Sequence, residues 1–210
     1  LQQGHVASWR DQLAVITHPQ LLLVYAKTAL GYGGAFTAFT FLVPILQQVS
    51  GFSSASVSLI LLVYGVSVAV GNIWGGRLAD QHGPHGALKR LFAGLALVLL
   101  TLTFTAYSPW LAVLTVLIWG AFAFGNVPGL QVLVVQQAER HVPRAVDVAS
   151  GLNIAAFNVG IALGSFIGGQ TVAHLGLMNT PWVGALIVLG AWGLTWLSAR
   201  QSTQGAPCVG

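Results

Sequence analysis

The sequence predicts an all-α membrane protein, a bundle of six transmembrane helices. Three observations lead to this fold class: long apolar segments with almost no internal charge, a hydrophobic fraction of 55% and a charged fraction of only 6%. An ordinary soluble domain is about one quarter charged residues. A soluble fold of 210 residues needs a polar exterior that this composition does not supply. Lipid is therefore the expected solvent.

Six apolar segments are each long enough to cross a bilayer, because a hydrocarbon core of about 30 Å needs about 20 helical residues. The segments cover residues 21–47, 54–76, 88–107, 110–134, 148–173 and 182–199. Ser108-Pro109 opens the fourth segment and Thr180-Pro181 opens the sixth, as expected of helix starts. The expected organisation is a linker at 1–20, a six-helix bundle at 21–200 and a polar tail at 201–210.

The basic residues give the orientation. Seven of the eight Lys and Arg residues fall before the first segment, in alternate connections, or after the last segment: Arg10, Arg77, Lys89, Arg90, Arg140, Arg144 and Arg200. The connections at 48–53, 108–109 and 174–181 carry no charged residue. The positive-inside rule makes the basic side cytoplasmic, so both termini are expected in the cytoplasm.

Lys27 is the exception, because it lies six residues into the first segment, about 9 Å along a helix. A charged group inside the membrane is a functional-site hypothesis. A lysine this close to the boundary can also extend its side chain to the surface. The sequence leaves both interpretations open.

Small residues at four-residue spacing predict close helix contacts. One pair, Gly71 and Gly75, lies in the second segment, and a longer series, Gly160, Gly164 and Gly168, lies in the fifth. These glycines are expected to be packing positions.

Polar residues at membrane depth are candidates for a cavity. Pro128 predicts a kink in the fourth segment, with Asn126 and Gln131 beside it. Those amides either line a cavity or satisfy the backbone groups freed by the kink. Asn153 and Asn158 are expected to face the bundle interior or a water-filled cavity, since an amide is unfavourable in lipid.

Several function classes find no support. The chain carries no nucleotide-binding loop, no nucleophile motif and no metal-ligand spacing, so an enzyme, a cofactor and a metal are not expected. Its basic residues are scattered and do not form a nucleic-acid-binding face. No Asp or Glu lies within the six segments, which leaves Lys27 as the one candidate for a proton relay in this bundle.

The turn after the second segment carries a family resemblance. Residues 76–83 read GRLADQHG, which resembles the signature that the major facilitator superfamily has between the second and third helices of each six-helix half. Gly76, Asp80 and Gly83 match by position. The basic residues expected at the neighbouring positions are missing. Degenerate copies are usual in the second half of the family, so the resemblance implies a C-terminal half.

A second stretch, residues 150–169, resembles the eleventh helix of the drug:proton antiporter branch. Within that branch the sugar-efflux, arabinose-efflux-permease-like group of bacterial inner membranes is the most similar, and the resemblance covers nearly all of residues 9–200. It implies half of a twelve-helix transporter whose two bundles rock around a central cavity. The implied function is proton-coupled efflux of small solutes such as sugars or drugs.

The resemblance also implies roles and partners. Asp80 is expected at a cytoplasmic gate, facing a helix end of the other half, although a local ion pair with Arg77 is the simpler alternative. Substrate contacts are expected from the cavity candidates Lys27, Tyr32, Asn126, Asn153 and Asn158. The expected partners are the lipid bilayer, a small-molecule substrate, and either an N-terminal six-helix half or a second copy of this chain. A non-transporting remnant or assembly module is the alternative function.

Overall fold

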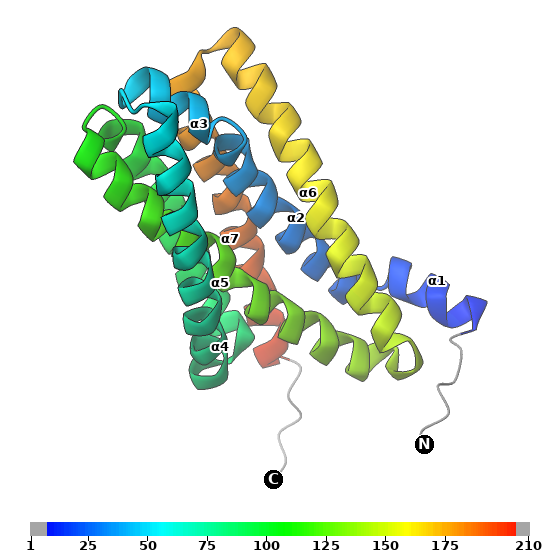
Figure 1. Cartoon of the computed structure of the whole chain (residues 1–210). Coiled ribbons are helices and arrows are strands. Elements are labelled where there is room, and N and C mark those ends of the chain that lie inside the picture. Colours follow the sequence, from blue (N-terminus) through cyan, green and yellow to red (C-terminus); the bar gives the residue numbers. More distant parts are fainter. Residues whose placement is uncertain (1–7, 205–210) are drawn as a thin grey trace.

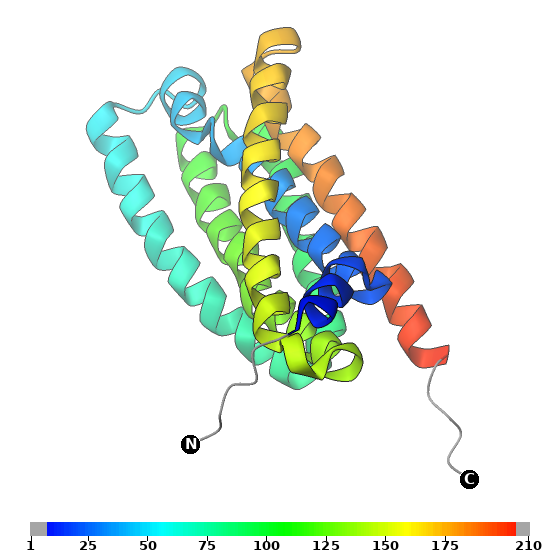
Figure 2. The same ribbon diagram turned by 90° about the vertical axis from the view of Figure 1, so that its right-hand side faces the viewer.

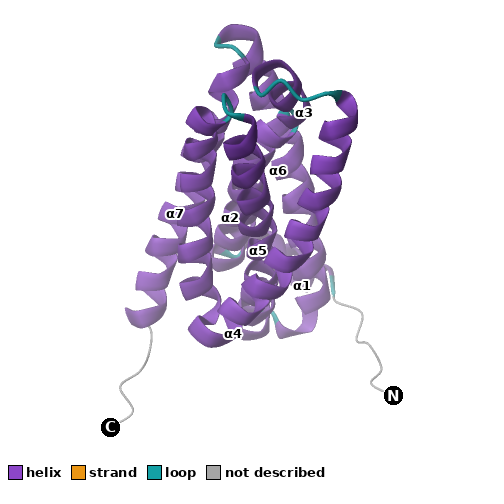
Figure 3. Cartoon of the chain, turned by 60° about the vertical axis from the view of Figure 1, so that its left-hand side comes forward, coloured by secondary structure: helices purple, strands orange, loops and turns teal. Residues whose placement is uncertain are grey.

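The computed structural model describes residues 8–204, with side chains described through residue 199. This part of the chain consists of helices joined by short connections (Figure 3). The α-helices are α1 (Trp9–Thr17), α2 (Pro19–Phe39), α3 (Leu42–Pro44), α4 (Ser54–Thr105), α5 (Pro109–His141), α6 (Val146–His174) and α7 (Thr180–Gln204). A π-helical turn follows α3 at Ile45–Val49, and two 3₁₀ turns cover Pro143–Ala145 and Leu177–Asn179.

Among the described residues, five helical runs are long and apolar enough to cross a membrane: Pro19–Val49, Ser54–Thr105, Pro109–His141, Pro143–His174 and Leu177–Ala199. The second run, α4, holds 52 residues, which would extend about 78 Å as one straight helix, more than twice a bilayer core. It is broken at Gly83, where φ is 71° and ψ is 162°, and the chain reverses direction there (Figure 1). A first arm at 54–82 and a second arm at 84–105 give two crossings. The predicted six-helix fold is confirmed.

The helices extend beyond the apolar segments that predicted them. The expected connection at 77–90 is helical up to His82 and again from Pro84, so only Gly83 leaves the helix. Glycine adopts this positive φ without steric cost, and proline fits the first turn of the helix that follows. Hydrophobicity marks where lipid surrounds a helix, and the polar residues beyond it continue the same hydrogen-bonded backbone.

The first crossing, in contrast, is interrupted near its end. The sequence predicts one helix over 21–47, but α2 ends at Phe39, and Phe41 has φ −108° and ψ 11°. Pro44 has no N–H to donate to the carbonyl of Thr40, so a regular helix cannot run through this point. The chain continues through α3 and the π-helical turn instead.

The start of α2, the Gly83 turn, the α5–α6 connection and the end of α7 lie at one end of the bundle, which we call the charged end (Figure 1). The predicted linker contributes α1 there. Ser8 caps α1: its hydroxyl accepts from the Asp11 amide, and the Asp11 carboxylate accepts from the Ser8 amide and hydroxyl. These hydrogen bonds lower the pKa of Asp11. The predicted tail falls mostly outside the described residues, since α7 continues to Gln204.

Helix α2 lies at the centre of the bundle and uses three glycines to approach three neighbours. A Cβ on Gly31 would come within 2.6 Å of the Phe92 ring on the second arm of α4. One on Gly33 would lie 3.2 Å from a backbone oxygen of α6, and one on Gly34 would lie 2.5 Å from a backbone oxygen of α7. No side chain fits between α2 and the backbones of α6 and α7 at Gly33 and Gly34, and Gly31 leaves room for the Phe92 ring, so van der Waals contact runs along all three neighbours.

The glycine series of α6 faces α2. A Cβ added to Gly160, Gly164 or Gly168 would overlap the α2 backbone, and the facing residues are Ala29, Gly33 and Thr37. The first arm of α4 meets α5 in the same way, since Gly71 and Gly75 lie against the backbones of Ala121 and Gly125.

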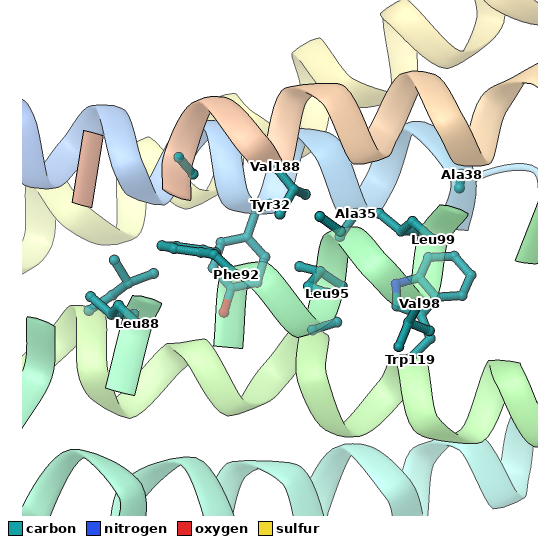
Figure 4. Close-up of a cluster of buried hydrophobic side chains, with 14 of the residues drawn as sticks. Tyr32, Ala35, Ala38, Leu88, Phe92, Leu95, Val98, Leu99, Trp119 and Val188 are labelled. Atoms are coloured by element: carbon teal, nitrogen blue, oxygen red, sulfur yellow. The ribbon is translucent and has the colours of Figure 1, made fainter. Parts of the chain in front are cut away.

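The second arm of α4 contributes a row of large side chains to the apolar core between α2, α5 and α7 (Figure 4). Its Leu88, Phe92, Leu95 and Leu99 side chains are fully buried. They point toward α2 and α7, with Trp119 of α5 closing one side (Figure 4). The second arm and α7 therefore form the back of the bundle, behind α2.

Lys27 is buried in this packing, with 1% of its surface exposed. Its ammonium donates to the Ser198 hydroxyl over 2.5 Å, which links α2 to α7, and Ser198 in turn donates to the Thr195 carbonyl over 3.3 Å. The part of the chain with described side chains gives Lys27 no acidic partner within salt-bridge distance. A buried charge is tolerated only when polar groups satisfy it, so this hydrogen bond is important to the α2–α7 contact.

The helix contact at Gly75 can be tested by adding one methyl group. Gly75→Ala is expected to destabilise the protein by about 1–3 kcal/mol, because the new Cβ overlaps the Gly125 backbone. Gly65→Ala, on the same arm with nothing within 4 Å, is the control and is expected to be neutral or stabilising. Thermal unfolding in detergent, followed by helical circular dichroism, measures both. Equal midpoints would contradict the close contact.

The Lys27–Ser198 hydrogen bond gives a second test. Ser198→Ala is expected to destabilise the protein by about 1–3 kcal/mol, because the buried ammonium loses its hydroxyl acceptor. Adding Lys27→Met to that variant removes the charge and is expected to restore most of the stability. The measurement is the thermal unfolding midpoint of the wild type, of Ser198→Ala and of the double variant. A double variant no more stable than Ser198→Ala would show that the charge is not the cause.

Candidate functional site

The candidate site is a cavity of about 340 Å³, open on one side and lined by α2, the first arm of α4, α5 and α6. Thr28 and Tyr32 stand one turn apart near the middle of α2, where the backbone is locked against α6 and α7. The complete lining is Thr28, Tyr32, Asn72, Phe124, Val127, Leu130, Gln131, Asn153, Ile154 and Phe157. The second arm of α4 and α7 contribute none of these residues.

A chain of hydrogen bonds crosses the cavity wall. The Thr28 hydroxyl on α2 donates to Asn153 Oδ1 on α6 over 2.7 Å. The Asn153 amide donates to Gln131 Oε1 on α5 over 3.4 Å. Each group orients the next, so three helices present a fixed set of polar atoms to the cavity.

Aromatic rings form the other part of the wall. The Tyr32 ring lies 4.0 Å from the Phe157 ring and 6.2 Å from the Phe124 ring, measured between centroids. The Tyr32 hydroxyl is buried and has no hydrogen-bond partner among the described residues. A buried hydroxyl without a partner is unfavourable, so a polar ligand atom that reached it would gain a strong hydrogen bond.

Every lining residue is uncharged. The wall combines amides and hydroxyls with aromatic and aliphatic surface, which is typical of sites for small organic ligands. Such a site can bind a neutral polar or amphipathic molecule through hydrogen bonds and ring contacts. The described residues include no group of three His, Cys, Asp or Glu side chains placed to hold a metal ion.

The structure brings two of the five sequence-selected cavity residues, Tyr32 and Asn153, into this lining. The predicted substrate contacts did not include Thr28, Asn72 and Gln131, although Gln131 was noted as an amide beside Pro128. Whether these side chains reach the cavity depends on the rotation of each helix about its axis. In a membrane helix that is apolar on all sides, the sequence pattern does not give that rotation.

The other three selected residues lie outside the lining. Asn126 is buried and donates to the carbonyls of Phe122 and Ala123, over 2.9 and 3.3 Å. Of the two amides beside Pro128, Asn126 therefore bonds to carbonyls of its own helix, neither of which is the Phe124 carbonyl that Pro128 leaves free, and Gln131 faces the cavity. Asn158 is exposed on α6 and donates to the Ile154 carbonyl. Lys27 is buried against α7.

The loop-motif residues lie at the charged end. Gly76 is in van der Waals contact with Pro128, where an added Cβ would lie 3.8 Å from the proline ring, and Gly83 makes the reversal of α4. Asp80 is exposed, and among the described residues it makes no ion pair or hydrogen bond, including with Arg77. Its carboxylate is therefore available to a group outside the described chain.

Comparison with known proteins agrees with this architecture. A family model described as Major Facilitator Superfamily matches residues 2–147 of the chain. The chain is 52% identical over 195 residues to the "Uncharacterized MFS-type transporter YtbD" of Bacillus subtilis, covering 93% of this chain and 49% of that protein.

Two further relatives carry more specific names. The "Inner membrane transport protein YdhP" of Escherichia coli K12 is 35% identical over 196 residues, covering 93% of this chain and 49% of the relative. The "Probable sugar efflux transporter" of Mannheimia succiniciproducens is 33% identical over 178 residues, covering 85% and 43%. The chain thus spans about half the length of the curated relatives it matches.

All three relatives are named as transporters, which agrees with the six-helix fold described above. The chain is a multi-pass membrane protein that belongs to the Major Facilitator Superfamily.

Proposed function

We propose that this chain is the C-terminal six-helix half of a proton-coupled exporter of small neutral or amphipathic solutes, such as sugars or drugs. The observation that carries the proposal is the uncharged cavity, in which a Thr28–Asn153–Gln131 hydrogen-bond chain faces aromatic rings. Sugars combine hydroxyls with apolar faces, which suits such a wall. The name of the Mannheimia relative supports efflux of a sugar.

A second six-helix bundle would complete the transporter. The first arm of α4 and helix α6 hold few buried residues along their length, and they flank the cavity on either side (Figure 1). A second bundle placed against them would close the cavity from the open side and leave it near mid-membrane depth. Rocking of the two bundles would then expose the cavity to each side in turn.

Asp80 would act at the gate of this transporter. It is exposed at the charged end without a partner in the described chain. A helix N-terminus of the second bundle would provide the partial positive charge that such a carboxylate prefers, and this contact would stabilise one access state. The positive-inside rule places this end, and with it both termini, in the cytoplasm of a cell whose inner membrane holds the protein.

Proton coupling would depend on the second bundle. The cavity lining carries no acidic residue, and no Asp or Glu lies in any predicted membrane segment of the chain. The proton-binding carboxylates of the proposed exporter would therefore belong to the other half. Lys27 would serve the α2–α7 contact and take no part in proton transfer.

Because the proposal assigns the proton-binding carboxylates to the other half, we expect the 210-residue chain, purified and reconstituted without a partner, to give no solute flux under a pH gradient. Vesicles made from the native membranes of the source cell, tested with the same labelled sugars, are the positive control. Flux by the chain alone would contradict the half-transporter proposal. Crosslinking would then show whether a homodimer is responsible, because two copies also provide twelve helices.

The cavity itself is tested in the intact transporter. Asn153→Leu keeps the side-chain volume but removes the centre of the hydrogen-bond chain, and we expect uptake into inverted vesicles to fall at least tenfold, the change that about 1.4 kcal/mol produces. Gln136→Leu replaces an exposed amide of α5, outside the lining and away from the two crossings that face the second bundle, and is expected to leave transport unchanged.

Protein level and thermal midpoint are compared for the two variants. Equal transport by the two at equal protein level would show that the cavity does not bind the solute, and a non-transporting assembly module would become the better interpretation.

A further inference from the structure

The back of the bundle carries a second concave surface that transport does not use. A groove of about 560 Å³ runs along α7, lined by Trp192, Gly193, Trp196 and Leu197. It lies on the face opposite the first arm of α4, at the outer edge of the bundle (Figure 2). None of its residues lines the candidate cavity. This surface is apolar and open, and Trp196 is 42% exposed.

A basic side chain closes the charged end of the groove. The Lys89 ammonium, on the second arm of α4, lies 3.9 Å from the centroid of the Trp196 ring. This cation–π contact fixes the ammonium above the ring. Among the residues with described side chains, Lys89 makes no ion pair with a carboxylate. The neighbouring Arg90 is exposed.

Further basic groups lie close by. His85 is near enough to Lys27, Lys89 and Arg140 for their charges to act on it. His85 therefore lies among three basic side chains, while the carboxylates of Asp80 and Glu139 are exposed at the same end of the bundle. Of these basic groups, the Lys89 ammonium lies at the groove, and the low-dielectric surroundings make its attraction for an anion stronger than in water.

We propose that the groove binds an anionic phospholipid, with one acyl chain along Trp192, Gly193, Trp196 and Leu197 and the phosphate against the Lys89 ammonium. Tryptophan rings prefer the boundary between headgroups and acyl chains, and Trp196 lies beside the Lys89 cation in the part of α7 nearer the charged end. Basic pockets between membrane helices are a known chemistry for anionic headgroups.

The charge and shape of the site together select this ligand. A free phosphate would use the cation but not the apolar groove, and a zwitterionic lipid would use the groove but gain less from Lys89. An anionic lipid uses both. The site is independent of the proposed transport function, because its residues and those of the cavity are on different faces of the bundle.

Native mass spectrometry of the purified protein, titrated with phosphatidylglycerol or with phosphatidylcholine of the same chains, tests the proposal. We expect phosphatidylglycerol to bind at least fivefold more tightly. Lys89→Gln is expected to remove this preference, since one basic residue near a membrane surface contributes about fivefold. Arg144→Gln, which removes an exposed cation from the same end but another face, is the control and is expected to keep the preference.

A second pair of variants tests the groove without changing a charge. A Cβ on Gly193 would meet nothing within 4 Å, so Gly193→Leu folds normally and fills the groove. We expect it to weaken phosphatidylglycerol binding several-fold. Gly65→Leu, on the first arm of α4 with equally open surroundings, is expected to have no effect.

Helical content and thermal midpoint confirm that each variant is folded. Three outcomes would overturn the proposal: equal affinity of the wild type for the two lipids, an unchanged preference in Lys89→Gln, or equal losses in Gly193→Leu and Gly65→Leu. Tight binding of free inorganic phosphate that competes with phosphatidylglycerol would show that the site recognises the phosphate alone.

Discussion

Close packing at three glycines of α2 is the constraint on which the rest of the bundle depends. Gly31, Gly33 and Gly34 lie on three sides of α2 and admit the second arm of α4, α6 and α7. In lipid, apolar side chains gain little by leaving their surroundings, so helices associate through close packing and interhelical hydrogen bonds. Glycine allows two helices to approach most closely. Because α2 has glycines on three sides, three helices pack around it and it lies at the centre of the bundle.

The cavity is a consequence of that arrangement. Because α6 is held tightly on α2, and the first arm of α4 is held on α5, these two crossings pack in separate pairs. The space between the pairs is where α2 and α5 present their polar side chains. The same packing fixes the rotation of α2, which directs Thr28 and Tyr32 to the cavity and Lys27 to α7.

Because packing fixes the rotation of the helices, the two faces of the bundle have different chemistry. The cavity face carries neutral amides, hydroxyls and rings, whose hydrogen bonds pass between helices. The back face carries an apolar core with one buried ammonium and a cation held on a tryptophan. A neutral solute suits the first face and an anionic lipid suits the second.

The sequence by itself determined the fold class and the six crossings, because apolar length and charge distribution reflect the thickness and dielectric of the bilayer. It also identified Tyr32 and Asn153, two polar residues at depth. Only the tertiary structure decided which amides face the cavity: Asn126 and Gln131 flank the same proline, yet one binds the backbone and the other lines the site. In a helix surrounded by lipid and protein, hydrophobicity hardly distinguishes one face from another, so rotation is set by the contacts of the neighbouring helices.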